Sequence, residues 1–566
     1  MIKSIILIFV LLIYTIYCKD INFSTNEKNV FRELEGKVPT LKIDIDEAEY
    51  QNLIDISQID MEKLVVECNL DASLLPSFET KVTLTYEQDG EKKIFKKVEF
   101  KTGGNWSRSN DRVGFNLKLN KNDRLFNTKN IKLRPDTTDF TSMRTKIAME
   151  LLYKWNLPSP HSTYIELYIN DKYFGLYYLE DGVKPNWIKN MYELPKDEEI
   201  TTLFNCKKDG ALMNLETANH CFNSNDDYAN YTQPIDEAFG AIEKATSIED
   251  LKKVINIDQF IKNIAIEFLF GSYDHFIVHA HNYLLYKKAD GIWDMILVDF
   301  DNELGNGLLS SWSFVLNRTA DDITKIKLEE MPKEESNIFN VAILQDQTLF
   351  KKALHELLVT GFNPDFTFPR IEEIKKLITP YVEKSITPNE DGSYPGVINL
   401  IGSPSVHTLK DFEDSFTSED QMKIGLKTWI QKRFEFTCET YGFDKDEILK
   451  EAAEYRKTGV FKSNENTNIG PQEKPKDVED DKCWSKALGY ECCDSCNVVF
   501  IDDKKQKWGS MNKQWCGIDK VKCANEILDC PKTAYPCCSH CNVSISEEYI
   551  RWGIENGDWC MINFSC

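Results

Sequence analysis

The chain of 566 residues has no dense run of lysine and arginine, and its formal net charge is −23 at pH 7. Contacts with nucleic-acid phosphates need clustered positive charge, so this deficit argues against a nucleic-acid partner. The acidic balance instead favours solubility. A chain of this length can bury a large core, and two to four domains are expected.

Long hydrophobic runs are also scarce. One apolar run, residues 5–17, follows Lys3. This order is typical of a secretory signal peptide, so residues 1–18 are predicted to be one, and the alternative of a retained anchor is disfavoured because the run is short. No second run is long enough to span a bilayer, and we therefore expect a secreted, extracellular protein. Six Asn-x-Ser/Thr sequons would be glycosylation sites in such a protein: Asn22, Asn105, Asn230, Asn317, Asn542 and Asn563.

Cysteine is unevenly distributed, because twelve of the 17 cysteines follow Asp481. In a secreted chain such crowding predicts disulfides, with zinc at Cys492, Cys493 and Cys496 as the alternative. Cys206 and Cys221 are near enough in sequence to close a small loop of their own.

The cysteine-rich end is an internal repeat. Residues 456–481 are rich in Asn, Glu, Lys and Pro, which is typical of a linker. Residues 482–523 and 529–566 each carry Tyr-x-Cys-Cys-x-x-Cys-Asn-Val, then Trp-Gly and Trp-Cys. A module of about forty residues cannot build enough core alone, so its six cysteines are expected to form disulfides, in any of fifteen connectivities. Some of its aromatic residues should be exposed and bind protein or sugar.

Residues 38–455 carry strand-like and helix-like patterns. Period-two alternation predicts antiparallel strands at 41–45, 80–86, 98–100, 115–119 and 131–133, with a turn at 88–90. Ser142 is predicted to cap a helix over 143–155 on which Arg144, Lys146 and Glu150 lie off the apolar face. A hairpin over 164–179 turns at 170–171, a helix follows at 257–270, and residues 411–455 are strongly helical.

Polar side chains gather at strand ends between residues 271 and 305. A short buried strand at 295–298 is followed by Asp299 and Asp301, which leave on the same side because side chains alternate along a strand. Two carboxylates so close repel unless a proton or cation lies between them, and Mg²⁺ suits oxygen ligands. Asp274 and Asn282 flank a second strand at 283–286 and are expected to converge with them.

Two alternatives stay open for this stretch. The Asp-Phe-Asp triplet is also compatible with a solvated turn after a strand. His279 and His281 beside it are interpreted as packing or solvent-facing histidines rather than ligands.

The repeated tail resembles the fungal dockerin modules of anaerobic gut fungi, which are related to family 10 carbohydrate-binding modules. The resemblance implies that the tail binds a scaffoldin protein in an extracellular cellulosome, with carbohydrate binding, for example to cellulose, as the alternative. It implies these scaffoldin-binding residues: Tyr490, Trp508, Trp515, Tyr535, Trp552 and Trp559.

Residues 38–455 resemble the CotH family, spore-coat proteins with an atypical protein-kinase-like fold. The matching text is 104–108, 143–146, 157–160, 168–177, 274, 282–286 and 299–305. The expected fold class is therefore α+β, an atypical protein-kinase-like domain plus two small disulfide-rich β modules.

The CotH resemblance also implies a site that uses ATP with Mg²⁺ or Mn²⁺. Asp274 becomes the catalytic base, and Asn282, Asp299 and Asp301 become metal ligands, with Asn282 also contacting nucleotide. Lys118 is the expected nucleotide-binding lysine, with Lys132 as the alternative.

Two further elements are expected to contact phosphate. Arg144 is one, and the loop at 103–108 is the other because its two glycines let backbone N–H groups approach an anion, with an ordinary turn as the alternative.

Three functions compete for this chain. The first is a secreted kinase acting on serine or threonine of a protein substrate, tethered by the tail. The second is a non-catalytic binding or structural component with the same fold. The third is a polysaccharide hydrolase, which is disfavoured because no other acid pair stands out beside Asp299 and Asp301.

Overall fold

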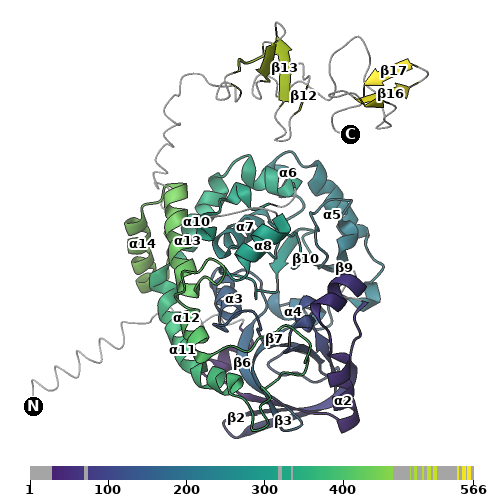
Figure 1. The fold of residues 1–566 in the computed structure, drawn as a ribbon, viewed down its shortest axis with the longest axis vertical. Coiled ribbons are helices and arrows are strands. Elements are labelled where there is room, and N and C mark those ends of the chain that lie inside the picture. Colours follow the sequence, from purple (N-terminus) through teal and green to yellow (C-terminus); the bar gives the residue numbers. More distant parts are fainter. Residues whose placement is uncertain are drawn as a thin grey trace, which may run out of the picture. The chain divides into compact units, whose positions relative to one another are not determined.

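The computed structural model describes residues 29–68, 74–316, 322–332, 335–462, 485, 490–493, 500–501, 507–511, 514–518, 545–546, 551–555 and 558–561. The predicted signal peptide, residues 463–481 of the predicted linker, and four of the sequons (Asn22, Asn317, Asn542 and Asn563) lie outside these residues. The chain divides into two compact units, Met1–Glu465 and Asn466–Cys566. Figure 1 shows both.

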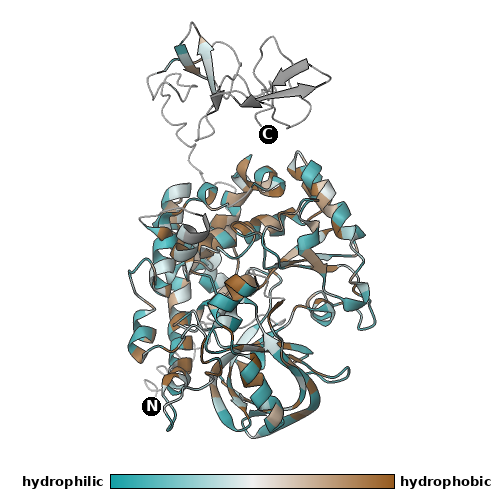
Figure 2. Ribbon diagram, turned by 45° about the vertical axis from the view of Figure 1, so that its right-hand side comes forward, coloured by the Kyte–Doolittle hydropathy of each residue, from teal (hydrophilic) through white to brown (hydrophobic). Residues whose placement is uncertain are grey.

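The first unit begins with a closed seven-stranded barrel in the order β1-β2-β3-β4-β5-β7-β6. Its strands are β1 (Thr40–Asp44), β2 (Glu79–Gln88), β3 (Glu91–Gly103), β4 (Gly114–Lys118), β5 (Asn130–Arg134), β6 (Ser162–Ile169) and β7 (Lys172–Asp181). The barrel closes because β1 pairs antiparallel with β2 and parallel with β6. Alternate residues fill its interior, among them Leu41, Phe115 and Leu179, and Figure 2 shows hydrophobic and hydrophilic residues interspersed along these strands.

Both predicted hairpin turns are confirmed. Gln88 pairs with Glu91 across a two-residue turn, and Ile169 pairs with Lys172 across another. Each turn needs left-handed backbone at both positions. Asp89 and Gly90 supply it in one turn, and Asn170 and Asp171 in the other.

Helix α3 (Arg144–Lys154) corrects two details of the sequence prediction. Ser142 does not cap it; instead the Asp139 carboxylate accepts hydrogen bonds from the first backbone amides, those of Met143 and Arg144. The helix is also buried on every side from Arg144 to Tyr153, including its polar residues there. These are tolerated because they are paired, with Lys146 lying 2.9 Å from Glu150, which also accepts two hydrogen bonds from Arg370.

The rest of the first unit is mainly helical, and most of it lies at the other end from the barrel, although the helix before β2 and a helix that packs on β7 lie beside the barrel (Figure 1). Its helices are α2 (Glu47–Ile56), α4 (Pro185–Met191), α5 (Gln233–Lys244), α6 (Ile248–Leu251), α7 (Ile257–Phe270), α8 (Leu308–Leu316), α9 (Asn337–Phe339), α10 (Thr348–Thr360), α11 (Pro364–Ile386), α12 (Leu409–Asp414), α13 (Leu426–Tyr441) and α14 (Lys445–Thr458). The apolar helix α7 has the bounds predicted from sequence and packs against α10 and α13.

A small sheet packs beside α7 in the order β11-β10-β8-β9. Its strands are β8 (Leu203–Cys206), β9 (Cys221–Asn223), β10 (Tyr283–Lys287) and β11 (Trp293–Leu297). A disulfide joins Cys206 and Cys221, as the sequence predicted. The first unit therefore mixes helix and sheet, which confirms that part of the expected fold class.

The second unit contains two three-stranded sheets with the same pairing. The strands are β12 (Phe500–Ile501), β13 (Lys507–Met511), β14 (Gln514–Gly517), β15 (Ile545–Ser546), β16 (Arg551–Glu555) and β17 (Asp558–Met561). Gly509 pairs with Cys516 in one sheet, and Gly553 pairs with Cys560 in the other, so the sequence repeat is also a structural repeat. A Cys493–Cys516 disulfide confirms that this region uses disulfides.

Within the described residues, no helix is both long and apolar enough to cross a membrane.

Candidate functional site

The hairpin β10–β11 brings together the two parts of the predicted site. Asn282 immediately precedes β10, and Asp299 follows β11 after one residue. Tyr283 pairs with Leu297, and the Val298 amide donates a 3.0 Å hydrogen bond to the Asn282 carbonyl. Asn282 and Asp299 therefore lie at the same end of this hairpin, as the sequence predicted.

Asp274 is held against this end by two neighbours. Asn282 Nδ2 donates to Asp274 Oδ2 at 3.0 Å, and His281 Nε2 lies 2.9 Å from Asp274 Oδ1. The Asp274 side chain remains 21% exposed, so it can meet a substrate hydroxyl from solvent. Its two hydrogen bonds fix the direction of the carboxylate without burying it.

Asp299 faces a cation that the sequence reading missed. Arg134, at the end of β5, places Nη2 3.2 Å from Asp299 Oδ2. Burial opposes ionisation of Asp299, but the Arg134 charge and then that of Lys132 hold its pKa below the usual value. Lys132 and Arg134 alternate along β5 and share a face, and this spacing is the signal that could have identified the pair.

The glycine-containing loop also lies beside Arg134. A Cβ atom built on Gly104 would lie 3.6 Å from Arg134 Nη1. Gly104 has a φ of +91°, and the backbone turns there from β3 into a short helical turn, Trp106–Ser109. The loop thus adjoins the positive side of the site.

Asp301 shares its surroundings with Asp299. Burial and then the Asp299 charge raise the pKa of Asp301 to about 8, and the Asp274 charge adds to this effect. The Asp301 side chain accepts a 3.1 Å hydrogen bond from Asn302 Nδ2. A proton on one of the two acids relieves their repulsion, and a hard divalent cation with oxygen ligands from Asn282, Asp299 and Asp301 would do the same, so the donor set fits Mg²⁺ or Mn²⁺.

The backbone around the site is strained. Ala280, Asn282, Asp299 and Leu304 all have φ between +48° and +74°, a region that non-glycine residues rarely adopt. Such conformations persist only where the surroundings impose them, and they gather at functional sites.

A buried ion pair underlies the site. His275 Nδ1 lies 2.8 Å from Glu303 Oε1, with both side chains fully buried, and His275 Nε2 lies 2.9 Å from the Val298 carbonyl. Burial alone would lower the pKa of His275, but the charge and hydrogen bond of Glu303, together with the charges of Glu267 and Asp274, outweigh it and raise that pKa to about 9. The imidazolium therefore ties the segment containing Asp274 to the one containing Asp299.

Two residues predicted to bind nucleotide lie elsewhere. Lys118 is half exposed on the outside of the barrel and pairs with Glu99 at 3.1 Å, so the structure does not bring it to the carboxylates. The charge of the alternative, Lys132, favours the ionised form of both Asp299 and Glu180 and acts to lower their pKa values. Arg144 is buried and donates to the carbonyls of Leu304 and Ile424 and to Asp139. These bonds make Arg144 a support for the loop after Asp301 rather than a phosphate contact.

The predicted scaffoldin-binding residues are described only in part. Tyr490 and Trp515 are 44% and 41% exposed, and the Tyr490 ring packs edge-on against Trp508 at 5.0 Å between centroids. Trp552 and Trp559 lie on β16 and β17 at the positions of Trp508 and Trp515. Their side chains, and Tyr535 as a whole, lie outside the described part of the chain.

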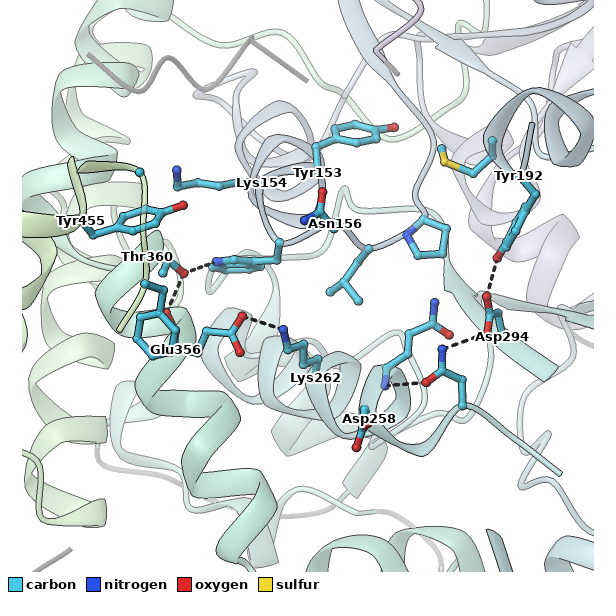
Figure 3. A pocket seen from close by; sticks show the side chains of 18 of the residues that line it. Tyr153, Lys154, Asn156, Tyr192, Asp258, Lys262, Asp294, Glu356, Thr360 and Tyr455 are labelled. Atoms are coloured by element: carbon cyan, nitrogen blue, oxygen red, sulfur yellow. Dashed lines mark hydrogen bonds and ion pairs between the residues drawn. The ribbon is translucent and has the colours of Figure 1, made fainter. Parts of the chain in front are cut away.

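A cavity of about 790 Å³ lies elsewhere in the first unit. Lys154, Tyr455, Lys262, Glu356 and Asp294 line it (Figure 3). It contains none of the predicted nucleotide or metal residues. The converging carboxylates and cations, rather than the size of a cavity, therefore locate the candidate site.

Comparison with known proteins places both parts of the chain in families. Residues 100–436 match the family described as "CotH kinase protein", and residues 482–518 and 529–562 match the family described as "Cellulose or protein binding domain". Inner spore coat protein H of Bacillus subtilis (strain 168) is 20% identical over 265 residues, which is 44% of this chain and 68% of that protein.

Fungal relatives match shorter segments. Endoglucanase B of Neocallimastix patriciarum is 42% identical over 65 residues, 11% of this chain and 13% of that enzyme, and feruloyl esterase B of Piromyces equi is 43% identical over 49 residues, 8% and 9% respectively. The solved double dockerin from Piromyces equi Cel45A is 38% identical and covers 15% of this chain and 88% of that one, with a TM-score of 0.10. The chain thus spans a small part of either fungal enzyme. The two family matches confirm both resemblances seen in the sequence.

Proposed function

The chain belongs to the CotH kinase protein family, and from that membership we propose that its first unit is an atypical kinase-like domain acting outside the cell. Its reaction is transfer of the terminal phosphoryl group of ATP to a serine or threonine hydroxyl of a protein. The observation that carries this proposal is the placement of Asp274, Asn282 and Asp299 at one end of the β10–β11 hairpin.

Each group of side chains in the site has a separate role in phosphoryl transfer. Asp274 orients the substrate hydroxyl and accepts its proton as the oxygen attacks phosphorus and ADP leaves. Asn282, Asp299 and Asp301 hold Mg²⁺ or Mn²⁺, which when bound neutralises phosphate charge. Arg134 and Lys132, beside the Gly104 loop, supply fixed positive charge for the phosphates.

The second unit is proposed to tether this domain to a scaffoldin of an extracellular cellulosome. Exposed Tyr490 and Trp515 offer rigid aromatic contacts of the kind found at protein interfaces. Membership of a family described as binding cellulose or protein supports the same role, and cellulose is the alternative ligand.

One observation favours a second candidate function, a non-catalytic binding module. Arg134 already neutralises Asp299 within the protein. A protein of this fold that no longer transfers phosphate could stabilise the Asp299 carboxylate with Arg134 alone, without a metal ion.

A phosphorylation assay separates these functions. The full-length chain is incubated with labelled ATP, Mg²⁺ or Mn²⁺ and a serine- and threonine-containing acceptor protein, beside Asp274→Asn and Asp299→Asn. We expect each variant to lose at least about 100-fold in transfer, the usual scale for a general base or a charge-stabilising group. Asp290→Asn is the matched control and should transfer phosphate like the wild type, because Asp290 is 60% exposed at the far end of the same hairpin and takes no part in catalysis.

The possible outcomes are distinct. Equal transfer by all four proteins would refute the site assignment. Nucleotide binding without transfer in the wild type would favour the non-catalytic module, and an absence of both would reject the kinase proposal.

A further inference from the structure

A second group of ligand-type side chains lies next to Asp274. One ligand atom from each of Asp209, His279 and His281 lies within 4.8 Å of the others. His279 Nδ1 is 2.7 Å from Asp209 Oδ1, and His281 Nδ1 is 3.9 Å from the same oxygen. The side chains are 49%, 14% and 19% exposed respectively, so solvent reaches the cluster while its histidines are largely enclosed.

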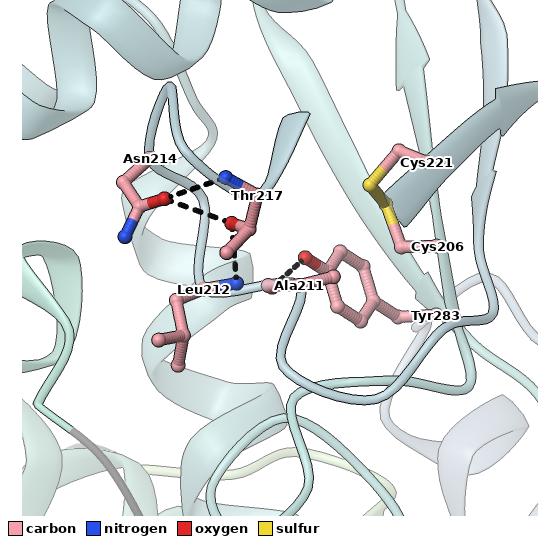
Figure 4. Close-up of a disulfide and its surroundings, with 7 residues drawn as sticks. All are labelled: Cys206, Ala211, Leu212, Asn214, Thr217, Cys221 and Tyr283. Carbon is pink, nitrogen blue, oxygen red and sulfur yellow. Dashed lines mark hydrogen bonds between the residues drawn. A yellow bond between two sulfur atoms is a disulfide. The ribbon is translucent and has the colours of Figure 1, made fainter. Parts of the chain in front are cut away.

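The loop that carries Asp209 is built to hold it there. The Cys206–Cys221 disulfide closes this loop, and Figure 4 shows it with the hydrogen bond from the Tyr283 hydroxyl to the Ala211 carbonyl. The amides of Gly210 and Ala211 donate 2.7 Å hydrogen bonds to the carbonyls of His279 and Ala280. These bonds tie the residues just after Asp209 to the 279–280 segment, and the pairing of Cys206 with Tyr283 fixes the strand just before it.

His281 presents a ring nitrogen that the protein leaves unsatisfied. Its Nε2 faces Asp274, so its Nδ1 is the ring atom that faces Asp209 and that must give up any proton it carries before it can bind a metal ion. That Nδ1 atom is buried and receives no hydrogen bond from any described residue. It faces the Asp209 carboxylate at 3.9 Å, and two lone pairs facing each other repel unless a proton or a cation lies between them.

We propose that Asp209, His279 and His281 bind a first-row transition-metal ion, with Zn²⁺ as the best match, at a site separate from the Mg²⁺ ligands. Two imidazoles and one carboxylate suit zinc, and three protein ligands leave a fourth position for water. In tetrahedral zinc sites neighbouring ligand atoms lie about 3.3 Å apart, given bonds of about 2.0 Å. The 2.7 Å and 3.9 Å separations lie on either side of that value, so binding an ion would lengthen the first contact and shorten the second by about 0.6 Å each.

The hydrogen bond from His281 to Asp274 completes the arrangement. Histidine ligands in metal sites commonly donate their second ring nitrogen to a carboxylate, which fixes the ring and its tautomer. Asp274 is that carboxylate here. The ion therefore holds His281 in place, and His281 in turn orients the carboxylate of Asp274, the candidate base.

Metal binding to the oxidised full-length chain tests this assignment. Zn²⁺ binding is measured by calorimetry and by elemental analysis after dialysis, without reductant, and Co²⁺ absorption in the visible range reports the ligands. We expect one equivalent to be lost, or its affinity to fall at least tenfold, in Asp209→Asn and in His279→Gln. His220→Gln is the matched control, because His220 lies in the same disulfide-closed loop but outside the cluster, and it should bind Zn²⁺ like the wild type.

Two results would overturn the proposal. One is equal stoichiometry and affinity in the wild type and both ligand variants. The other is no Zn²⁺ uptake by the wild type at pH 8, which would mean that a proton alone occupies the space beside His281. Melting temperatures of the metal-free proteins verify folding, and Asp209→Asn should fold because Asp209 is 49% exposed.

Discussion

Glu267 is a fully buried carboxyl beneath the segment that carries Asp274. Its Oε2 atom accepts a 2.8 Å hydrogen bond from the Ile277 amide. Burial raises the pKa of Glu267 to about 7, although the His275 charge partly opposes this. The folded protein thus keeps a proton that the unfolded chain releases near its ordinary pKa of about 4.3.

This difference makes stability depend on pH. Between about pH 4.3 and pH 7 the folded state binds more protons than the unfolded state, so this group lowers the free energy of unfolding as pH rises, by at most about 1.4 kcal/mol per pH unit. Glu267→Gln keeps the acceptor for Ile277 and cannot ionise. We expect the variant to gain stability relative to the wild type from pH 5 to pH 8, measured by urea unfolding, with a constant difference above that. If the stability difference between Glu267→Gln and the wild type does not change with pH, Glu267 is not the group that holds the extra proton in the folded state.

At the residue scale, the sequence predicted the position of the acidic residues of the site better than that of the basic residue that faces Asp299. Asp274, Asn282, Asp299 and Asp301 could be found because strand alternation and strand ends place them without knowledge of distant partners. The cation that faces Asp299 comes from β5, and only the pairing of the barrel strands decides which basic residue of that region lies beside Asp299. The alternation of Lys132 and Arg134 shows that they share a face, but Lys118 follows an alternating pattern too, so sequence alone could not decide which strand places its basic residues at Asp299.

At the element scale, Trp429 on α13 fixes both ends of the 271–305 segment. Gly271 and Gly305 both have positive φ, and a methyl group on either would collide with the Trp429 indole ring. Trp429 Nε1 also donates a 3.1 Å hydrogen bond to the Leu269 carbonyl at the end of α7. One side chain therefore sets where the site segment begins and ends.

Alanine substitution tests this contact. Gly271→Ala and Gly305→Ala combine left-handed strain with overpacking and should each destabilise the first unit by about 3 kcal/mol or more in denaturant unfolding. Gly291→Ala is the matched control, since Gly291 has a φ of +87° but no atom within 4 Å of the added methyl, and it should cost only about 1–2 kcal/mol. Equal costs at the three positions would mean that Trp429 does not constrain the segment.

The Cys206–Cys221 disulfide stabilises the first unit through the loop it closes. The two cysteines are 15 residues apart, a length for which loop-closure entropy predicts about 3 kcal/mol. Cys206→Ser with Cys221→Ser should lower the free energy of unfolding by roughly that amount. Cys438→Ser, which removes a buried thiol that is not in a disulfide, is the control and should cost less. A double variant as stable as the wild type would show that the hydrogen bonds from Gly210 and Ala211 suffice to hold the loop.

Elements with local signals were predictable and those with distant partners were not. Turn residues identified both hairpins of the barrel, and the apolar stripe of α7 gave its bounds. The parallel pairing of β1 with β6 joins segments more than a hundred residues apart, and no local pattern encodes it. Helix α3 was read as amphipathic because the charges that neutralise its buried Lys146 and Glu150 come partly from Arg370, far along the chain.

At the scale of the whole molecule, the presence of two modules at the end of the chain, rather than one, should raise the affinity for a scaffoldin. Two linked modules that engage one scaffoldin bind more tightly than either alone, because the second contact forms at the high effective concentration set by the link between them, with gains of about 10²–10⁴. The same strand register in both sheets supports equivalent binding surfaces, on which Trp508 and Trp552 hold corresponding positions.

Single and double substitutions measure that gain. Trp508→Ala or Trp552→Ala alone should weaken scaffoldin capture by the full chain at least tenfold, since each leaves one working module, whereas the double variant should abolish capture and leave cellulose binding unchanged. Trp106→Ala, an exposed tryptophan of the first unit, is the control and should bind like the wild type. If both single variants bind as the wild type does, only one module engages at a time or the modules are redundant, and avidity is excluded. If the double variant instead loses binding to cellulose, the modules bind sugar, and the first unit is directed to the polysaccharide rather than to the scaffoldin.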